Sequence, residues 1–148
     1  MMQRVDIVRA DSCHIGQIAE IESSCIPGGW SEQAFAQALE NENSLMYAAV
    51  CGENTAGFLN GSYVLDEAEL LNIAVSKEYR RCGIAVRLYN EFENRLLKLG
   101  VKIVYLEVRE SNIAAERLYS KLGFERSGFR KNYYRSPSEN AVLMMKKL

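Results

Sequence analysis

The sequence has little of what metal centres and histidine-dependent catalysis require. Its 148 residues include one histidine, His14, and four cysteines, none of which forms a CxxC pair. Zinc sites draw several Cys or His ligands at short spacings, so no metal site is expected. A cysteine nucleophile would normally be activated by a histidine. Because His14 is far along the chain from the glycine turn described below, a solvated or capping role is favoured for it.

Excess charge and long apolar runs are also missing. A formal net charge of -1 argues against a strongly basic nucleic-acid binder. No apolar run approaches membrane-spanning length, and the N-terminal MMQRVDIVRADS lacks the apolar segment of a signal peptide. We therefore expect a cytoplasmic protein with reduced thiols, without membrane or direct nucleic-acid partners, and favour a monomer. The length fits a single domain over residues 1–148.

Residue patterning predicts alternating strands and helices. Strands are expected at 4–9, 45–50, 56–63, 69–75, 101–108, 124–131 and 141–147, with a loop at 132–140. Helices are expected after four capping positions, namely Asp11, Ser31, Gly83 and Asn112. The strand, helix and strand around Gly83 imply a parallel pair with a right-handed crossover. The fold class is therefore α/β with a mixed, mostly antiparallel sheet flanked by helices, and the apolar end of 69–75 predicts burial on both faces.

A basic glycine turn precedes the third of these helices. It reads Arg80-Arg81-Cys82-Gly83-Ile84-Ala85. Glycine allows close backbone approach, and a helix start offers unpaired N–H groups at the positive end of the helix dipole. The turn therefore suits a diphosphate, although a plain strand–helix junction with solvated arginines is the alternative. It is neither a Walker loop nor the three-glycine dinucleotide fingerprint.

Four short motifs in a fixed order carry a family resemblance. They are residues 70–75, Arg80-x-x-Gly83-x-Ala85, Leu106-Glu107-Val108-x-x-x-Asn112, and Leu118-Tyr119-x-x-x-Gly123-Phe124. This arrangement resembles the GNAT N-acetyltransferase superfamily. The resemblance implies the GNAT acyl-CoA N-acyltransferase fold, with acetyl-coenzyme A as cosubstrate and a central parallel strand pair that splays apart. It also implies a list of cofactor-binding residues: Arg80, Arg81, Cys82, Gly83, Ile84 and Ala85 at the diphosphate, the backbone of Ile73, Ala74 and Val75 at the pantetheine arm, and Asn112.

A closer resemblance is to the bacterial ribosomal-protein-alanine N-acetyltransferases. It is carried by residues 72–75, 106–112, 118–124 and 130–134, and by Pro27…Trp30-Ser31, which looks like their Pro-Trp-Ser loop with two glycines inserted. The resemblance implies an N-terminal alanine of a small-subunit ribosomal protein as acceptor. It also implies a peptide groove walled by Trp30, Tyr133 and Tyr134. For the basic and aromatic segment 126–135, a solvated strand edge ranks second and RNA contact third.

Glu107 is a single acid within an apolar strand. A buried unpaired carboxylate is costly, so it needs a partner or a task. An ion pair with Arg109 or Lys102 is one explanation. The resemblance implies the other, a general base that acts directly or through one water, because an α-amino group with a pKa of about 8 attacks only when neutral. Glu69 on the preceding strand is the rival base.

Tyr119 is expected on the inner side of the fourth helix. Core packing with a satisfied hydroxyl is one interpretation. By resemblance, Tyr119 is the general acid that protonates or stabilises the leaving thiolate. Asn112 can serve as both N-cap and cofactor contact. Cys82 departs from the pattern, because close relatives usually carry a basic residue there.

These observations favour an N-acetyltransferase that acts by direct transfer through a ternary complex onto a protein N-terminus. A second hypothesis keeps the fold but takes a small amine, an antibiotic or a lysine side chain as acceptor. Loops 25–30 and 132–140 would decide between these, since specificity diverges in loops. A third hypothesis, a non-catalytic acetyl-coenzyme A-binding or ribosome-associated module, is disfavoured by the presence of Glu107 and Tyr119.

Overall fold

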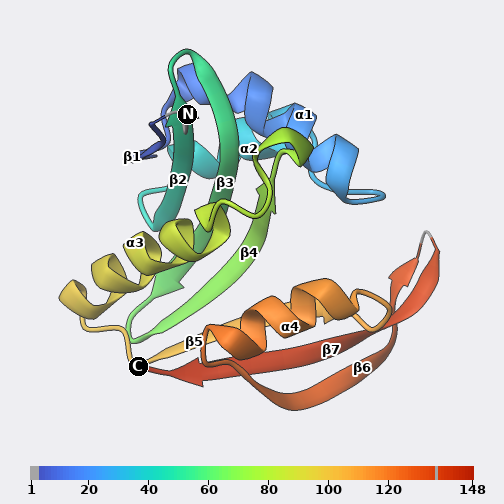
Figure 1. Cartoon of the computed structure of the whole chain (residues 1–148). Helices are drawn as coiled ribbons and strands as arrows, with labels where there is room; N and C mark the ends of the chain where they lie inside the picture. Colours follow the sequence, from blue (N-terminus) through green and yellow to red (C-terminus); the bar gives the residue numbers. More distant parts are fainter. Residues whose placement is uncertain (1–3, 136) are drawn as a thin grey trace.

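Within the residues that the structure describes, seven strands form one sheet in the order β1-β2-β3-β4-β5-β7-β6 (Figure 1). The computed structural model describes residues 4–135 and 137–148. The strands are β1 (Asp6–Arg9), β2 (Ser44–Cys51), β3 (Asn54–Val64), β4 (Glu67–Val75), β5 (Ile103–Arg109), β6 (Glu125–Arg135) and β7 (Ser138–Lys147). The helices are α1 (Ile15–Cys25), α2 (Glu32–Glu40), α3 (Ile84–Lys98) and α4 (Ile113–Lys121), with short 3-10 turns at Ser12–His14 and Lys77–Tyr79. The predicted order of strands and helices is confirmed.

The parallel pair β4–β5 is the point at which the sheet opens. The two strands pair only through Glu67, Ala68 and Glu69, opposite Ile103, Val104 and Tyr105. Beyond Glu69 they diverge, so that β5 continues with β7 and β6 while β4 stays with β3 (Figure 1). All the other strand pairs of the described part of the chain are antiparallel. The predicted mixed sheet with a splayed parallel pair is confirmed.

A β-bulge in β4 lies where the strands part. Opposite β3, Leu70 pairs with Gly61 and Asn72 pairs with Asn60, which leaves Leu71 as the extra residue. A bulge bends a strand and locally increases its twist. Here the bend directs residues 72–75 away from β5. Gly61 is needed beside it, because a Cβ there would lie 2.5 Å from the Phe92 ring.

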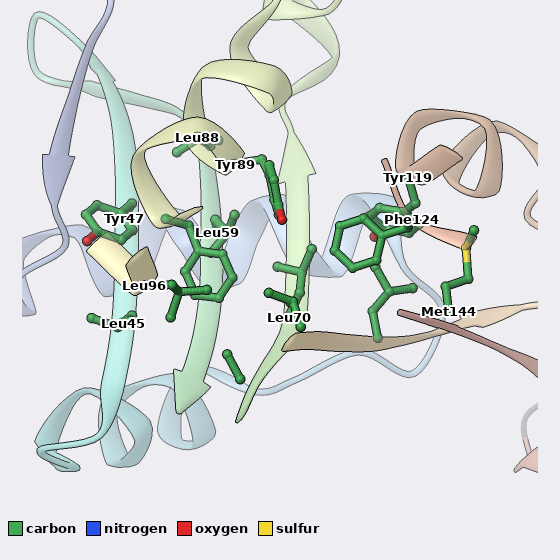
Figure 2. Packing of buried hydrophobic residues seen from close by; sticks show 14 of the residues in the cluster. Leu45, Tyr47, Leu59, Leu70, Leu88, Tyr89, Leu96, Tyr119, Phe124 and Met144 are labelled. Carbon is green, nitrogen blue, oxygen red and sulfur yellow. The ribbon is translucent and has the colours of Figure 1, made fainter. Parts of the chain in front are cut away.

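Helices cover the two faces of the sheet separately. One core cluster joins α3 and α4 to the sheet through residues such as Leu88, Tyr89, Tyr119, Phe124 and Met144 (Figure 2). The other packs α1 and α2 on the opposite face. The predicted apolar stripes explain both: Ile15, Ile18 and Ile21 are buried on α1, as are Tyr89, Phe92 and Leu96 on α3.

The predicted helix caps take the expected roles. The Ser31 hydroxyl accepts a hydrogen bond from the Ala34 N–H, and the Asn112 amide oxygen accepts one from the Ala115 N–H. Asp11 caps the 3-10 turn before α1, where His14 Nδ1 accepts from the Asp11 N–H at 2.9 Å. His14 is therefore a capping residue, as favoured from the sequence.

Two local predictions are wrong. The end of β4 is not buried on both faces, since Leu71 is exposed and residues 73–75 are half-buried. Its apolar residues face the opening between β4 and β5 instead. The loop 132–140 is mostly strand, because β6 runs to Arg135 and β7 begins at Ser138. An irregularity between Arg130 and Tyr134, with Asn132 at φ 51°, disguised this continuity; position 136 lies outside the described residues.

Within the described ranges, no helix combines the length and apolar character that crossing a membrane would need.

Candidate active site

A cleft of about 760 Å³ occupies the opening between β4 and β5. Its walls come from α1 and the loop after it, from β4, from the start of α3, and from β5 and α4. Most residues predicted for the site line it: Trp30, Ile73, Ala74, Val75, Arg80, Arg81, Gly83, Ile84, Ala85, Glu107, Asn112, Tyr119 and Tyr134. Cys82 and Tyr133 are not among the lining residues.

One end of the cleft is the start of α3. Gly83 is the N-cap in the left-handed conformation, at φ 72°, and no side chain of residues 4–135 and 137–148 caps the helix. A Cβ on Gly83 would meet no atom within 4 Å, so the positive φ, and not lack of space, calls for glycine. Arg81 also has a positive φ, 64°, and both arginines of the turn are exposed. The unpaired N–H groups and the two cations can therefore face an anion together.

Arg80 is partly tethered within this turn. Its Nε donates to the Val75 carbonyl at 3.3 Å, and its Nη2 lies 3.4 Å from the Cys25 sulfur. The neighbouring Cys82 thiol is exposed and donates to the Arg80 carbonyl at 3.6 Å. The Cys82 side chain therefore contacts the backbone of its own turn and does not line the cleft.

The middle of the cleft is bordered by the free side of β4. Among the strand pairs in the described ranges, β4 has no partner on its β5 side after Glu69. Backbone groups on that side of residues 70–75 are left without a ladder, and backbone N–H and C=O groups need hydrogen-bond partners. An extended ligand with amide groups could provide them.

Glu107 enters the cleft from β5. Its side chain is 33% exposed and its Oε1 lies 3.8 Å from Arg130 Nη1 on β6. A hydrogen bond to Glu107, together with burial, raises the pKa of the Tyr133 hydroxyl. The ion-pair partner recorded for Glu107 is therefore Arg130, which sequence reasoning had not considered. Arg109, one of the predicted partners, forms an ion pair with Glu139 at 3.3 Å.

Glu69, the rival base, sits outside the cleft lining. It is exposed and lies beside Tyr105 at the last paired position of the parallel strands. It still contributes to the raised pKa of Tyr133, after Glu107. Glu69 and Glu107 therefore share a neighbourhood, with Glu107 nearer the opening.

Tyr119 reaches the cleft from α4 and is nearly buried, with 9% of its surface exposed. Burial first, then the nearby Tyr134 and Glu22, raises the pKa of its hydroxyl well above the usual value. Its ring packs edge-on against Phe124, with ring centroids 6.0 Å apart (Figure 2). Tyr119 thus holds its proton firmly while it borders the opening.

Glu107 and Tyr119 come from opposite faces of the sheet. On β5, Leu106 and Val108 point into the core that includes Tyr119, so the alternating Glu107 points to the other face. Both side chains line the same cleft because the sheet is open between β4 and β5. The opening is what brings the two predicted reactive groups together.

Tyr134 from β6 completes this wall. Burial first, then the Glu107 charge, raises its pKa to about 12. The Arg109 guanidinium lies over its ring at 4.3 Å from the centroid. Tyr134 is therefore held beside Glu107 as a neutral phenol.

Sequence reasoning missed a buried polar chain on the cleft floor. Asn60 Nδ2 donates to Asn72 Oδ1 at 2.9 Å, and Asn72 Nδ2 donates to Glu22 Oε2 at 2.7 Å. Glu22 is 1% exposed although it is an acid. The available signal was its position on the apolar stripe of α1, one residue after Ile21 and four after Ile18.

Comparison with known proteins agrees with this geometry. The model of the Acetyltransferase (GNAT) family matches residues 15–124. The chain belongs to the acetyltransferase (GNAT) family. The chain is thus an N-acetyltransferase, as the sequence motifs predicted.

Similar proteins are known by sequence and by structure. The ribosomal protein bS18-alanine N-acetyltransferase of Escherichia coli is 40% identical over 117 residues, 78% of each chain. The protein of that name from Haemophilus influenzae is 37% identical over 141 residues, covering 93% of this chain and 95% of its own. The crystal structure of the ribosomal-protein-S18-alanine N-acetyltransferase from Escherichia coli superposes with a TM-score of 0.89 at 34% identity, covering 97% and 94% of the two chains.

Proposed function

We propose that this GNAT enzyme transfers an acetyl group from acetyl-coenzyme A to the N-terminal α-amino group of a ribosomal protein that begins with alanine. The observation that carries the proposal is that one cleft contains a carboxylate from β5, a phenol from α4, a free strand edge and an open helix start. The names of the similar proteins from Escherichia coli and Haemophilus influenzae supply the acceptor class.

The chain's residues fit the proposed cosubstrate. Bound acetyl-coenzyme A supplies a diphosphate, an arm with two amides, and a thioester that an amine can attack. The start of α3 with Arg80 and Arg81 suits the diphosphate. The free side of β4 at residues 73–75 suits the amides, and Asn112 lines the same cleft. Because Cys82 and Ala85 can contribute backbone N–H groups to this turn, their side chains can vary without removing those donors.

Glu107 is the proposed general base. An incoming ammonium must lose a proton before its nitrogen can attack, and a carboxylate within direct or one-water reach can accept it. Glu107 is one-third exposed, which leaves it open to an acceptor. The neighbouring Arg130 Nη1 is 3.8 Å from Glu107 Oε1, too far to hold the carboxylate in a short hydrogen bond.

Tyr119 is the proposed group at the leaving sulfur. As the new C–N bond forms, the C–S bond breaks and its electron pair goes to sulfur. Because the pKa of Tyr119 is raised by burial, its hydroxyl keeps its proton at neutral pH, and Tyr119 lines the cleft. A thiol has a pKa of about 8.5, so stabilisation of the thiolate by a hydrogen bond costs less than complete proton transfer from this phenol.

The acceptor would enter between Trp30 and the end of β6. Trp30, from the loop after α1, and Tyr134, from β6, both line the cleft, and Tyr133 is held next to Glu107. A protein N-terminus is thin and extended, so it suits an entrance between the loop that ends at Trp30 and the end of β6. A small-amine acceptor would not need contacts with Trp30, Tyr133 and Tyr134.

Mass spectrometry would test the proposal. The protein is incubated with acetyl-coenzyme A and peptides that begin with Ala, Ser, Met or Lys, and the acetyl group is located by fragmentation. We expect acetylation of the α-amino group, fastest for Ala. Acetylation confined to lysine side chains would refute the proposed acceptor, and no acetylation of any amine would favour a binding module.

A further inference from the structure

We propose that Glu22 is a positioning residue that holds the acceptor loop, residues 26–30, over the cleft and ties it to the cofactor strand β4. The inference rests on the proposed function only for the acceptor that the loop contacts. It concerns a side chain that takes no part in the proton transfers assigned to Glu107 and Tyr119.

A single oxygen of Glu22 makes both connections. Oε2 accepts the backbone N–H of Trp30 at 3.1 Å and the Asn72 side-chain N–H at 2.7 Å. Trp30 ends the acceptor loop, and Asn72 follows the bulge that turns β4 away from β5. Asn60 on β3 donates in turn to Asn72 and holds it in place. The loop and the strand are thus fastened to one buried point.

The backbone of the loop is fitted to this carboxylate. A Cβ on Gly29 would lie 2.8 Å from Glu22 Oε2 and Cγ, closer than real Cβ atoms approach. The glycine therefore allows the chain to lie directly on Glu22. The Trp30 ring then packs on Phe35 of α2, with centroids 5.3 Å apart. Trp30, at the end of the loop, is therefore anchored twice, by its backbone N–H and by its indole.

Retaining an acid here carries an energetic cost that simple packing would avoid. Glu22 Oε1 is buried and has no hydrogen-bond partner among the described residues. Burial raises the pKa of Glu22 against the lowering effect of its two hydrogen bonds, and Tyr119 on α4 faces the same carboxyl group. An apolar residue would avoid the burial of a carboxylate but would leave the N–H groups of Trp30 and Asn72 without their acceptor, so the accepting oxygen is the property that Glu22 contributes.

The test compares Glu22→Leu, which removes the accepting oxygen, with Glu22→Gln, which keeps one. Trp30 is the only tryptophan, so its emission reports on the loop directly, without substrate. For Glu22→Leu we expect a shifted Trp30 emission and a KM for the acceptor peptide raised about tenfold, with kcat and the KM for acetyl-coenzyme A nearly unchanged. Glu22→Gln should restore both readouts. Glu20→Leu on the exposed side of α1 is the matched control and should change neither.

Gly29→Ala tests the same contact from the other side. Its methyl group should displace the loop in the native background but add little when combined with Glu22→Ala, a non-additivity expected of touching residues. The inference is wrong if Glu22→Leu and Gly29→Ala both leave the Trp30 emission and the acceptor KM unchanged. It is also wrong if Glu22→Leu lowers kcat at unchanged KM. The emission readout stands even if the acceptor proves to be another amine.

Discussion

Phe124 is joined to Tyr119 twice: its backbone N–H donates to the Tyr119 carbonyl at 2.9 Å, and its ring packs edge-on against the tyrosine ring. The first contact belongs to the Schellman ending of α4, in which the Gly123 N–H also donates to Ser120. The signal that ends the helix therefore also positions the proposed acid.

Gly123→Ala should disturb both stability and catalysis. Gly123 has φ +101°, which an alanine adopts only with a strain of about 1–2 kcal/mol. We expect a lower unfolding temperature and a lower kcat, because the ending of α4 holds Tyr119. Gly100→Ala is the matched control: Gly100 has φ +81° at the end of α3, and a Cβ added there would meet no described atom within 4 Å. It should lose similar stability in thermal denaturation and keep its turnover.

Glu107→Gln should lower kcat by about 100-fold or more, as loss of a general base does. The dissociation constant of acetyl-coenzyme A, measured by calorimetry, should hardly change, because Glu107 lies on β5, away from the diphosphate turn. Glu69→Gln is the comparison variant. If Glu69→Gln lost more activity than Glu107→Gln, the base would be Glu69.

Tyr119→Phe should lower kcat by about 100-fold, the effect typical of removing one buried donor in a transition state. In the native enzyme, the raised pKa of Tyr119 keeps its hydroxyl protonated to above pH 10. Activity should therefore rise with pH through the acceptor amine's pKa near 8 and stay high to at least pH 10. A decline that begins near pH 9 and vanishes in Tyr119→Phe would contradict this assignment.

Arg81→Ala should raise the KM for acetyl-coenzyme A about tenfold, since a charge-assisted contact to phosphate is lost. The effect should shrink in high salt, because exposed charges are screened. Arg95→Ala, an exposed change at the far end of α3, provides the control. Equal effects of the two substitutions would show that only the overall charge matters.

Glu22→Gln should unfold at the same or a higher temperature than the native protein at pH 7. Burial raises the pKa of Glu22 in the fold above its unfolded value, and Tyr119 stays neutral in this range. The stabilisation from the bound proton is complete below the unfolded pKa and is lost as pH rises through the folded one. The unfolding temperature of the native protein should therefore rise relative to that of Glu22→Gln as pH falls from 7 toward 4.5, as measured by thermal denaturation. A native protein that loses stability relative to the variant over that range would contradict the raised pKa.

The sequence by itself determined the order of strands and helices, their caps, and the turn before α3. These features depend on local causes: apolar periodicity, side chains that accept N–H bonds, and glycines at positive φ. It also showed two polar groups in apolar surroundings: the carboxyl group of Glu107 in an apolar strand and the hydroxyl group of Tyr119 on the apolar side of a helix. The closeness of these two could be expected only through family resemblance.

Only the tertiary structure decided which side chains line the cleft. The bulge at Leu71 and the early end of β4–β5 pairing open the sheet, so two residues from opposite faces line one space. Nothing local in the sequence assigns Arg130 to Glu107, or Asn72 to Glu22. Such partners depend on long-range packing, which brings residues together across a bend in the sheet that no single segment specifies.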